Sequence, residues 1–427
     1  MKKIISFVIA LEMLLCSGCG KNYEEDLKKE NGQNSIVQKE AEYITNAQNY
    51  YSECIFADDG AGYYFTVVKK DGYELFYYDD NMSEAVPLCS KVNCMHSGED
   101  CDAYFSKEEC MEGFIWYQNK SLFRIEQDTT TKNVYLMSSD RDGGNSRQVS
   151  MLWSGDNIRY KFKTIYFRSM VMHKGYLYYT YQLDVNDDIQ YYRIPITGGE
   201  RELIGTILNS DDIKQFGEVH FSNNDDGIYL SLDASLKEGE QRLFMLYQYE
   251  INEDKFENIY SEAGIYDFRW VKDAGGNTVD KDGDGWSGKI DVMELAFDNN
   301  GYMYINEMMT GNIIKYNLST KEASQIYQIK GSGNIAYYNN ALYVNNYDIV
   351  DKSQARVVVL SLDGEVLDEI VSETSDMYFG DDKYLFFRYY ADYAKTKKDE
   401  GTDADYVYMV YNRNTKEFKK ILQGTLR

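Results

Sequence analysis

Basic residues and histidines are scarce in this sequence, and no apolar run is long enough to cross a membrane. Lys and Arg number 45 against 70 Asp and Glu, which gives a formal net charge of −25 at pH 7. This charge argues against nucleic acid as a partner, because phosphates would repel the chain, and against electrostatic docking to anionic lipid. No Ser or Cys nucleophile motif accompanies the three histidines, and no Gly-rich phosphate loop opens a helix. The sequence therefore offers no catalytic residue and favours a protein that is not an enzyme.

An apolar run near the start of the chain, residues 4–15, follows two lysines and is interrupted by Glu12. Crossing a bilayer takes roughly 20 apolar residues, so this run predicts a secretory signal and not a membrane span. Two small residues then precede Cys19. This arrangement resembles the lipobox of bacterial lipoproteins, in which the cysteine is acylated after cleavage. The alternative is an ordinary signal peptide with incidental cysteines.

We therefore expect residues 1–18 to be a lipoprotein signal peptide. Lipid on Cys19 would hold the protein at the outer face of the bacterial cytoplasmic membrane, since two acyl chains give a stable anchor. Residues 19–49 are rich in Lys, Glu, Asn and Gln and lack clustered apolar residues, which predicts a flexible polar tether. Residues 50–427 remain for the folded domain.

A repeated pattern fills that domain. The sequence holds 41 tyrosines and 32 glycines but only two prolines, a composition typical of Tyr-rich strands divided by Asn, Asp and Gly turns. A turn leading into an aromatic strand recurs seven times, at residues 57, 117, 173, 223, 298, 338 and 380. A strand, a polar turn and another strand follow each copy, as in YYRIPITGGERELIG at 191.

Each repeat predicts a meander of about four short antiparallel strands, which is too small to bury its own faces. Radial stacking covers both faces and leaves short edges. The predicted fold class is therefore all-β: a β-propeller of four-stranded antiparallel blades, with seven blades favoured and six or eight as alternatives. A β-sandwich or two stacked barrels would not explain turn chemistry that repeats in one order.

Four features of the sequence indicate a family resemblance. They are the segments YYRIPITGGERELI and IKYNLSTKEASQIY, the Cys19 lipobox, and the segment PLCSKVNCMHSGEDCDAYF at 87–105. With them the chain resembles the exported, tyrosine-rich β-propeller lipoproteins of gut Firmicutes, of the DUF5050 and TolB-like propeller type. The resemblance implies fold and location. It implies no defined activity.

A cysteine and histidine cluster is predicted to form a knuckle inserted at about residues 87–112. Cys89, Cys94, His96 and Cys101 follow the spacing C-x4-C-x-H-x4-C. Three thiolates and one imidazole are a tetrahedral zinc set, and a short knuckle without core residues would fold around the metal. Disulfides are the alternative, because exported thiols commonly pair.

The cysteine count bears on this choice. With Cys19 acylated, five cysteines remain in the mature chain, so disulfides alone leave one thiol over. Zinc in the knuckle, with Cys54 and Cys110 forming a disulfide or staying free, accounts for all five. Both zinc and disulfides stay open at this point.

A second insertion, at about residues 264–292, contains the acidic segment DKDGDGWSGKID. Its spacing matches a twelve-residue calcium loop. The expected ligands are Asp280, Asp282, Asp284, the carbonyl of Trp286, and Asp291. No amphipathic helix flanks the loop, which favours structural calcium over calcium sensing. A solvated acidic turn without metal is the alternative.

The remaining polar candidates are expected to be structural. His173 and His220 lie in a turn and a strand, and the pairs Asp211–Asp212 and Asp381–Asp382 are expected to be solvated turn charges. Tyrosine suits both sheet packing and the recognition of sugars or peptides. The tyrosines that could form such a surface are Tyr347, Tyr389, Tyr390 and Tyr393.

Together these observations predict a surface-anchored binding or scaffold module for an extracellular glycan, peptide or envelope protein. One alternative is a propeller glycoside hydrolase or lyase that uses two carboxyl groups about 5 to 10 Å apart. Another is an extracytoplasmic sensor subunit for a membrane partner.

Overall fold

The structure, a computed structural model, describes residues 56–69, 71–96, 98–106, 110–155, 170–182, 187–225, 227–237, 241–265, 270–272, 278–280, 295–306, 311–329, 334–346, 356–372, 377–391 and 405–425. The chain divides into two compact units, Met1–Tyr43 and Ile44–Arg427, and every described residue belongs to the second. Strands make up nearly all of its regular structure, and the described residues include one short 3-10 helix, η1 (Gly98–Asp100). Within those residues no helix is long and apolar enough to cross a membrane.

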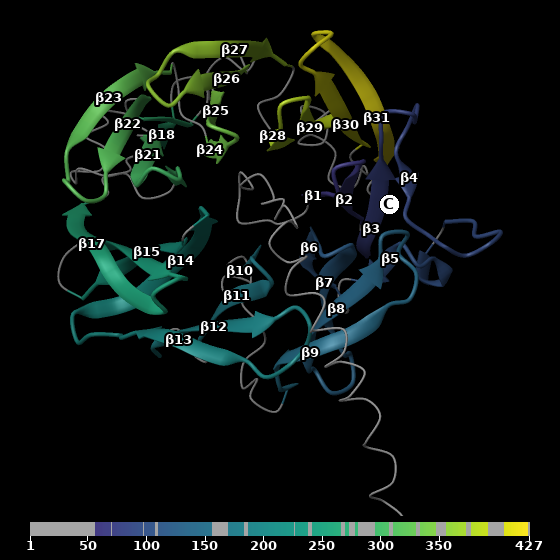
Figure 1. The fold of residues 1–427 in the computed structure, drawn as a ribbon, viewed down its shortest axis with the longest axis horizontal. Coiled ribbons are helices and arrows are strands. Elements are labelled where there is room, and N and C mark those ends of the chain that lie inside the picture. Colours follow the sequence, from purple (N-terminus) through teal and green to yellow (C-terminus); the bar gives the residue numbers. More distant parts are fainter. Residues whose placement is uncertain are drawn as a thin grey trace, which may run out of the picture. The chain divides into compact units, whose positions relative to one another are not determined.

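In the part of the chain that the structure describes, all strands except β18 and β19 form seven antiparallel sheets, which are the blades of a propeller (Figure 1). Blade 1 contains β1 (Phe56–Asp58), β2 (Tyr63–Val68), β3 (Gly72–Tyr78), β4 (Val86–Pro87) and β5 (Tyr104–Ser106). Blade 2 contains β6 (Cys110–Gln118), β7 (Ser121–Gln127), β8 (Val134–Asp140) and β9 (Arg147–Trp153). Blade 3 contains β10 (Met170–His173), β11 (Tyr176–Tyr181), β12 (Ile189–Pro195) and β13 (Glu202–Ile207).

Blade 4 contains β14 (Ile213–Asn223), β15 (Gly227–Leu236), β16 (Gln241–Glu250) and β17 (Lys255–Ile265). Blade 5 contains β20 (Leu295–Phe297), β21 (Tyr302–Asn306), β22 (Asn312–Asn317) and β23 (Ala323–Gln328). Blade 6 contains β24 (Ile335–Tyr338), β25 (Ala341–Asn346), β26 (Arg356–Ser361) and β27 (Val366–Val371). Blade 7 contains β28 (Met377–Gly380), β29 (Tyr384–Ala391), β30 (Asp405–Asn412) and β31 (Glu417–Thr425). A separate hairpin, β18 (Trp270–Lys272) and β19 (Thr278–Asp280), lies in the chain between blades 4 and 5.

The predicted seven-bladed propeller is confirmed. Each predicted copy of the turn and aromatic strand gives the first turn and second strand of one blade. The first strand of each blade lies nearest the centre of the ring and the fourth lies outermost (Figure 1). Consecutive strands pair in sequence order, so each blade is a simple meander, except that β4 and β5 both pair with β3 in blade 1.

Among the described residues, the core consists of seven apolar clusters, one at each boundary between neighbouring blades. Alternate residues of a strand face opposite sides of its sheet, so each blade contributes to the clusters on both of its sides. The ring closes between blades 1 and 7 without a shared strand. There Phe56 packs against Phe386 with ring centroids 4.6 Å apart, and the backbone N–H of Ala85 donates to the carbonyl of Ile421 at 2.7 Å.

The two ends of the blades differ. Because neighbouring strands are antiparallel, the turns after the first and third strands share one end of each blade, which we call the turn face. Its connections range from two residues, such as 119–120, to the segment 79–85. The opposite end, which we call the loop face, receives the remaining connections. The longest of these are 154–169, 266–294, 347–355 and 392–404.

Charged side chains at the turn face join the blades. In every blade, a charged residue in the turn between the third and outer strands bonds to the preceding blade, and we call these contacts the turn bonds. Arg413 of blade 7, for example, donates to the Tyr343 hydroxyl of blade 6 at 2.8 Å. In order of blade, the residues are Asp80, Arg141, Arg201, Asp254, Lys321, Asp363 and Arg413.

Candidate metal centre

The knuckle lies within the outer strand of blade 1. Pro87 pairs with Phe76 on β3, and Tyr104 pairs with Glu74. Leu75, between these two β3 residues, accepts from the backbone N–H of Leu88 and donates to the carbonyl of Ala103, both at 2.8 Å. The chain therefore leaves the strand after Leu88 and rejoins it at Ala103, so residues 89–102 are an excursion from one strand position.

The excursion occupies the place of a β-bulge. In the other six blades the pairing of the third and outer strands shifts register, as at a bulge. Blades can be aligned on the buried second-strand residue that packs toward the next blade: Tyr64, Phe123, Tyr178, Tyr229, Tyr304, Tyr343 and Phe386. In this alignment, the register shift of blades 2, 3, 4, 5 and 7 falls at the position that Leu75 and Phe76 occupy in blade 1. Residues 89–102 thus enlarge a single-residue bulge into a loop.

Local contacts shape this loop before any metal is considered. Asn93 and His96 adopt positive φ angles of 63° and 50°, which reverse the chain on both sides of Cys94. The Lys91 ammonium lies 2.9 Å from the Asp102 carboxylate and donates to the carbonyl of Asp100 at 2.8 Å. These bonds draw the two ends of the loop together.

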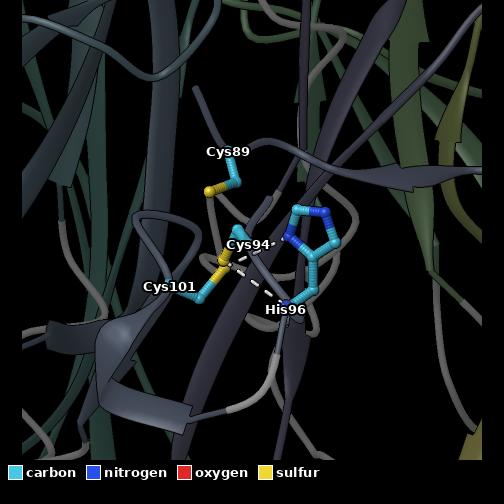
Figure 2. A group of neighbouring side chains, drawn as sticks. All are labelled: Cys89, Cys94, His96 and Cys101. Carbon is cyan, nitrogen blue, oxygen red and sulfur yellow. Dashed lines mark hydrogen bonds between the residues drawn. The ribbon is translucent and has the colours of Figure 1, made fainter. Parts of the chain in front are cut away.

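The structure brings the four predicted ligands together. One donor atom from each of Cys89, Cys94, His96 and Cys101 lies within 4.8 Å of all the others (Figure 2). The His96 backbone N–H donates to Cys94 Sγ at 3.4 Å, and Cys101 Sγ lies 3.5 Å from His96 Nδ1. Cys101 is buried, Cys89 and Cys94 are half-buried, and His96 is exposed.

The thiols differ in their ease of ionisation. Burial raises the pKa of Cys101 to about 12, and contact with the thiols of Cys94 and Cys89 adds to the rise. Burial also opposes ionisation of Cys89, but backbone hydrogen bonds from Lys91 and Asp102 and the neighbouring thiols together lower its pKa. A bound cation would displace the thiol protons, because the thiolate is the form that ligates a metal.

This donor set fits a metal ion of the zinc type. Zn–S bonds of about 2.3 Å in a tetrahedron put sulfur atoms about 3.8 Å apart, so ligand atoms within 4.8 Å need small shifts to close on an ion. Soft sulfur and imidazole ligands disfavour calcium and magnesium. Four protein ligands complete the tetrahedron and leave no open position, which is the arrangement of a structural site.

The other predicted sites lie mostly outside the described residues. This holds for Cys19, Cys54, Asp282, Asp284, Trp286, Asp291, Tyr347 and Tyr393. Asp280 ends β19, whose pairing with β18 places a hairpin before the predicted calcium loop. Cys110 begins β6, and Tyr389 and Tyr390 belong to β29, but the structure describes only their backbone.

The expectation that Asp381 is a solvated turn charge is wrong. Asp381 is buried, and its carboxylate accepts from the hydroxyl of Tyr63 at 2.7 Å and from the backbone N–H groups of Lys383 and Tyr384. Its neighbour Asp382 is exposed, as expected. Tyr63 belongs to blade 1 and reaches Asp381 across the ring closure.

The two remaining histidines have structural surroundings. His173 is buried, with its Nδ1 3.1 Å from the side-chain nitrogen of Asn223 in blade 4, and burial lowers its pKa to about 4. His220 pairs with Ser231 in the sheet of blade 4.

The turn bonds were not predicted. Their signal is a charged residue in every turn before an outer strand, which in sequence cannot be told from an ordinary solvated turn.

Comparison with known proteins leaves the family undetermined. No family model matches the chain, and no functionally curated protein matches it. Among solved structures, a prolyl endopeptidase aligns with a TM-score of 0.44 and 9% identity over 96% of this chain, which spans 56% of that protein. An uncharacterized protein from Listeria monocytogenes aligns with a TM-score of 0.43 and 9% identity, covering 74% of this chain and 82% of that one.

A TolB-type protein from Agrobacterium tumefaciens aligns with a TM-score of 0.30 and 12% identity, covering 59% of this chain and 78% of that one. At these scores the likenesses say nothing about activity. The assignment of a propeller fold rests on the strand pairing within this chain.

Proposed function

We propose that this chain is an exported lipoprotein, anchored by lipid on Cys19, whose propeller binds an extracellular glycan, peptide or envelope protein at its loop face. The signal layout before Cys19 and the polar segment at 19–49 support the location. The lipid would keep the propeller outside the cell and near the membrane.

The observation that supports binding at the loop face is the contrast between the two faces. Short turns and inter-blade bonds occupy the turn face, whereas four connections of nine or more residues begin and end at the loop face. Binding residues concentrate on loops that a rigid scaffold positions. These connections contain the aromatic residues Tyr160, Phe162, Tyr166, Phe167, Tyr266, Phe268, Trp270, Trp286, Tyr347 and Tyr393.

Site-specific photo-crosslinking on intact cells tests this proposal. A photoreactive amino acid at the exposed residues Thr130 or Ser210 would probe the loop face. The same group at Asn252 or Asn414, both exposed in third-to-outer turns, is the matched control at the turn face. We expect defined adducts from the loop-face positions alone. Equal adduct yields from both faces would contradict the assignment.

We further propose that Cys89, Cys94, His96 and Cys101 hold one structural zinc ion, and that disulfides do not form among them. Zinc would tie the departing end of the interrupted strand, at Cys89, to the returning end, at Cys101. Elemental analysis of the full chain should find one knuckle zinc, lost in Cys101→Ser and kept in Cys54→Ser. Zinc-free protein with oxidised knuckle cysteines would refute this assignment.

For the insertion between blades 4 and 5, we propose structural calcium held by Asp280, Asp282, Asp284, the Trp286 carbonyl and Asp291. The twelve-residue spacing supports it. Calcium retained after gel filtration should disappear in Asp282→Ala and persist in Asp212→Ala, a change of an exposed acid elsewhere. Unchanged calcium content in Asp282→Ala would rule out this loop as the site.

A further inference from the structure

A hollow of about 590 Å³ lies at the boundary between blades 5 and 6, on the turn face. Small-ligand sites generally fall between about 300 and 1,000 Å³. Strands β21 to β23 of blade 5 form most of its wall, and the turn of blade 6 that holds Asp363 completes it. It lies away from the knuckle and the loop face, so it is a separate feature of the molecule.

The boundary between blades 3 and 4 shows which partners a cation has at the matched position. Lys315 pairs with Tyr304 in blade 5 as Arg193 pairs with Tyr178 in blade 3. The Lys315 ammonium lies 4.5 Å from the ring centre of Tyr302, and the Arg193 guanidinium lies 5.0 Å from that of Tyr176. Both boundaries therefore place a cation over an aromatic ring at the same register.

Two matched positions differ between these boundaries. Arg193 donates to the hydroxyl of Tyr249 from blade 4 and to the carboxylate of Glu202 on its own outer strand. By register, Leu360 matches Tyr249 and Ser324 matches Glu202. Leucine lacks both the ring and the hydroxyl, and serine is too short to reach the cation. Lys315 therefore lacks the two partners that Arg193 has at these matched positions, and its ion-pair partner is Asp363 of blade 6.

The groups around the hollow indicate what would enter it. Lys315, whose side chain is 18% exposed, pairs at 2.8 Å with Asp363, whose side chain is 84% exposed. Because the carboxylate is solvated, the pair is weak enough to share its hydrogen bonds with a ligand. Asn317 and Ser324 add amide and hydroxyl groups, and Ile326 adds an apolar surface. Glu322 and Asp363 together outweigh the single ammonium, which disfavours an anionic ligand.

We propose that this hollow binds a neutral pyranose ring of an extracellular glycan. A pyranose ring is small enough to enter a hollow of about 590 Å³. One of its hydroxyls would accept from Lys315 as the Tyr249 hydroxyl accepts from Arg193. Its other hydroxyls would meet Asn317, Ser324 and Asp363, while its C–H groups contact Ile326. This site goes beyond the loop-face proposal and stands or falls independently of it.

Affinity electrophoresis of the full chain in detergent tests the proposal, with soluble glucan, mannan, galactan or xylan in the gel and polygalacturonate as the anionic comparison. We expect at least one neutral polysaccharide to retard the chain. Ser324→Trp, which fills the hollow, and Lys315→Met, which removes the cation, should each weaken binding about tenfold or more. Lys420→Trp, an equally bulky change at an exposed position of β31, should leave retardation unchanged.

Several outcomes would overturn the proposal. They are retardation by none of the neutral polysaccharides, retardation by polygalacturonate alone, and retardation that Ser324→Trp leaves intact. Binding of N-acetyltyrosinamide without any sugar, measured by saturation-transfer NMR, would assign the hollow to a tyrosyl side chain of a peptide instead.

Discussion

Two carboxyl groups near the ring closure are held in surroundings that disfavour their charge. Burial, with help from the nearby charge of Asp381, raises the pKa of Asp58 to about 6, although the backbone N–H of Gly60 donates to it at 2.6 Å. Burial raises the pKa of Asp381 as well. At neutral pH the ionised form of Asp58 is therefore held at a cost to the folded state, and burial opposes the charge of Asp381.

This cost predicts a pH-dependent stability. The pKa of Asp58 is higher in the folded chain than the 3.8 of an unperturbed aspartate, so between about pH 4 and 6 the folded state binds more protons. Stability from this group is therefore complete below pH 4 and is lost as the pH rises through 6. Asp58→Asn should stabilise the chain by about 1–2 kcal/mol at pH 7.5 and hardly at pH 4.

Urea unfolding of wild type and variant at both pH values measures this difference. Asp71→Asn, at an exposed position of blade 1, is the control and should shift neither curve. A gain from Asp58→Asn that is equal at pH 4 and pH 7.5 would show that charge is not its cause.

Residues with the same turn chemistry can thus have opposite surroundings. Asp381 and Asp382 are adjacent in one turn, and nothing in the local sequence separates them. Tyr63, more than 300 positions earlier in the chain, donates to the first, which is buried, whereas the second is exposed. Such burial depends on long-range packing, so a turn motif alone could not predict it.

At the scale of strands, the enlarged bulge of blade 1 lets the chain leave the outer strand for the knuckle without disturbing the sheet around it. Leu75, Leu88 and Phe105 belong to the cluster between blades 1 and 2, and all three stay on one side of the sheet across the interruption. The excursion therefore leaves the inward and outward alternation of the outer strand unchanged.

Deleting residues 89–102, so that Leu88 is followed by Ala103, should leave a single-residue bulge of the kind found in blades 2, 3, 4, 5 and 7. We expect this variant to fold, to unfold cooperatively within a few degrees of wild type, and to be insensitive to a zinc chelator. Circular dichroism with thermal melting is the measurement. The full-length Cys101→Ser chain is the comparison and should melt earlier, because it keeps the loop without its metal.

Loss of cooperative unfolding in the deletion variant would mean that the knuckle is required for the propeller to fold. The zinc assignment would then be judged by elemental analysis alone.

The repeats themselves could be predicted because their signals are local. Tyr-rich strands and Asn, Asp and Gly turns recur in one order, and each local signal agrees with the same meander. The four knuckle ligands could be grouped for a similar reason, since they are close in sequence. The insertion of the knuckle within the outer strand could not be predicted, because β4 and β5 are two and three residues long and are defined by pairing with β3.

For the whole molecule, the boundary between blades 1 and 7 differs from the other six because the two blades are not consecutive in the chain. Side-chain bonds across it include Tyr63 to Asp381 at 2.7 Å and Tyr384 to Asp80 at 2.6 Å. Both acceptors are carboxylates, and hydrogen bonds to charged groups contribute about 1.5–3 kcal/mol, more than bonds between neutral groups.

Removing the Tyr63 hydroxyl should therefore destabilise the ring more than removing a matched hydroxyl elsewhere. Tyr63→Phe is expected to cost about 2 kcal/mol. Tyr179→Phe, which removes a buried bond to the carbonyl of Leu152 across the boundary of blades 2 and 3, should cost about 1 kcal/mol. Chemical denaturation of both variants decides between them, and an equal or smaller loss in Tyr63→Phe would contradict this account.

The place where the knuckle leaves its strand also makes the propeller a display scaffold. Leu88 and Ala103 bond to the two sides of one residue, Leu75, so their separation is fixed by the sheet and not by the length of what joins them. A segment of different length or composition could be exchanged there in a single genetic step without shifting the register on either side. The rim of blade 1 is therefore a position at which new loops can be gained or lost while the ring beneath them stays the same.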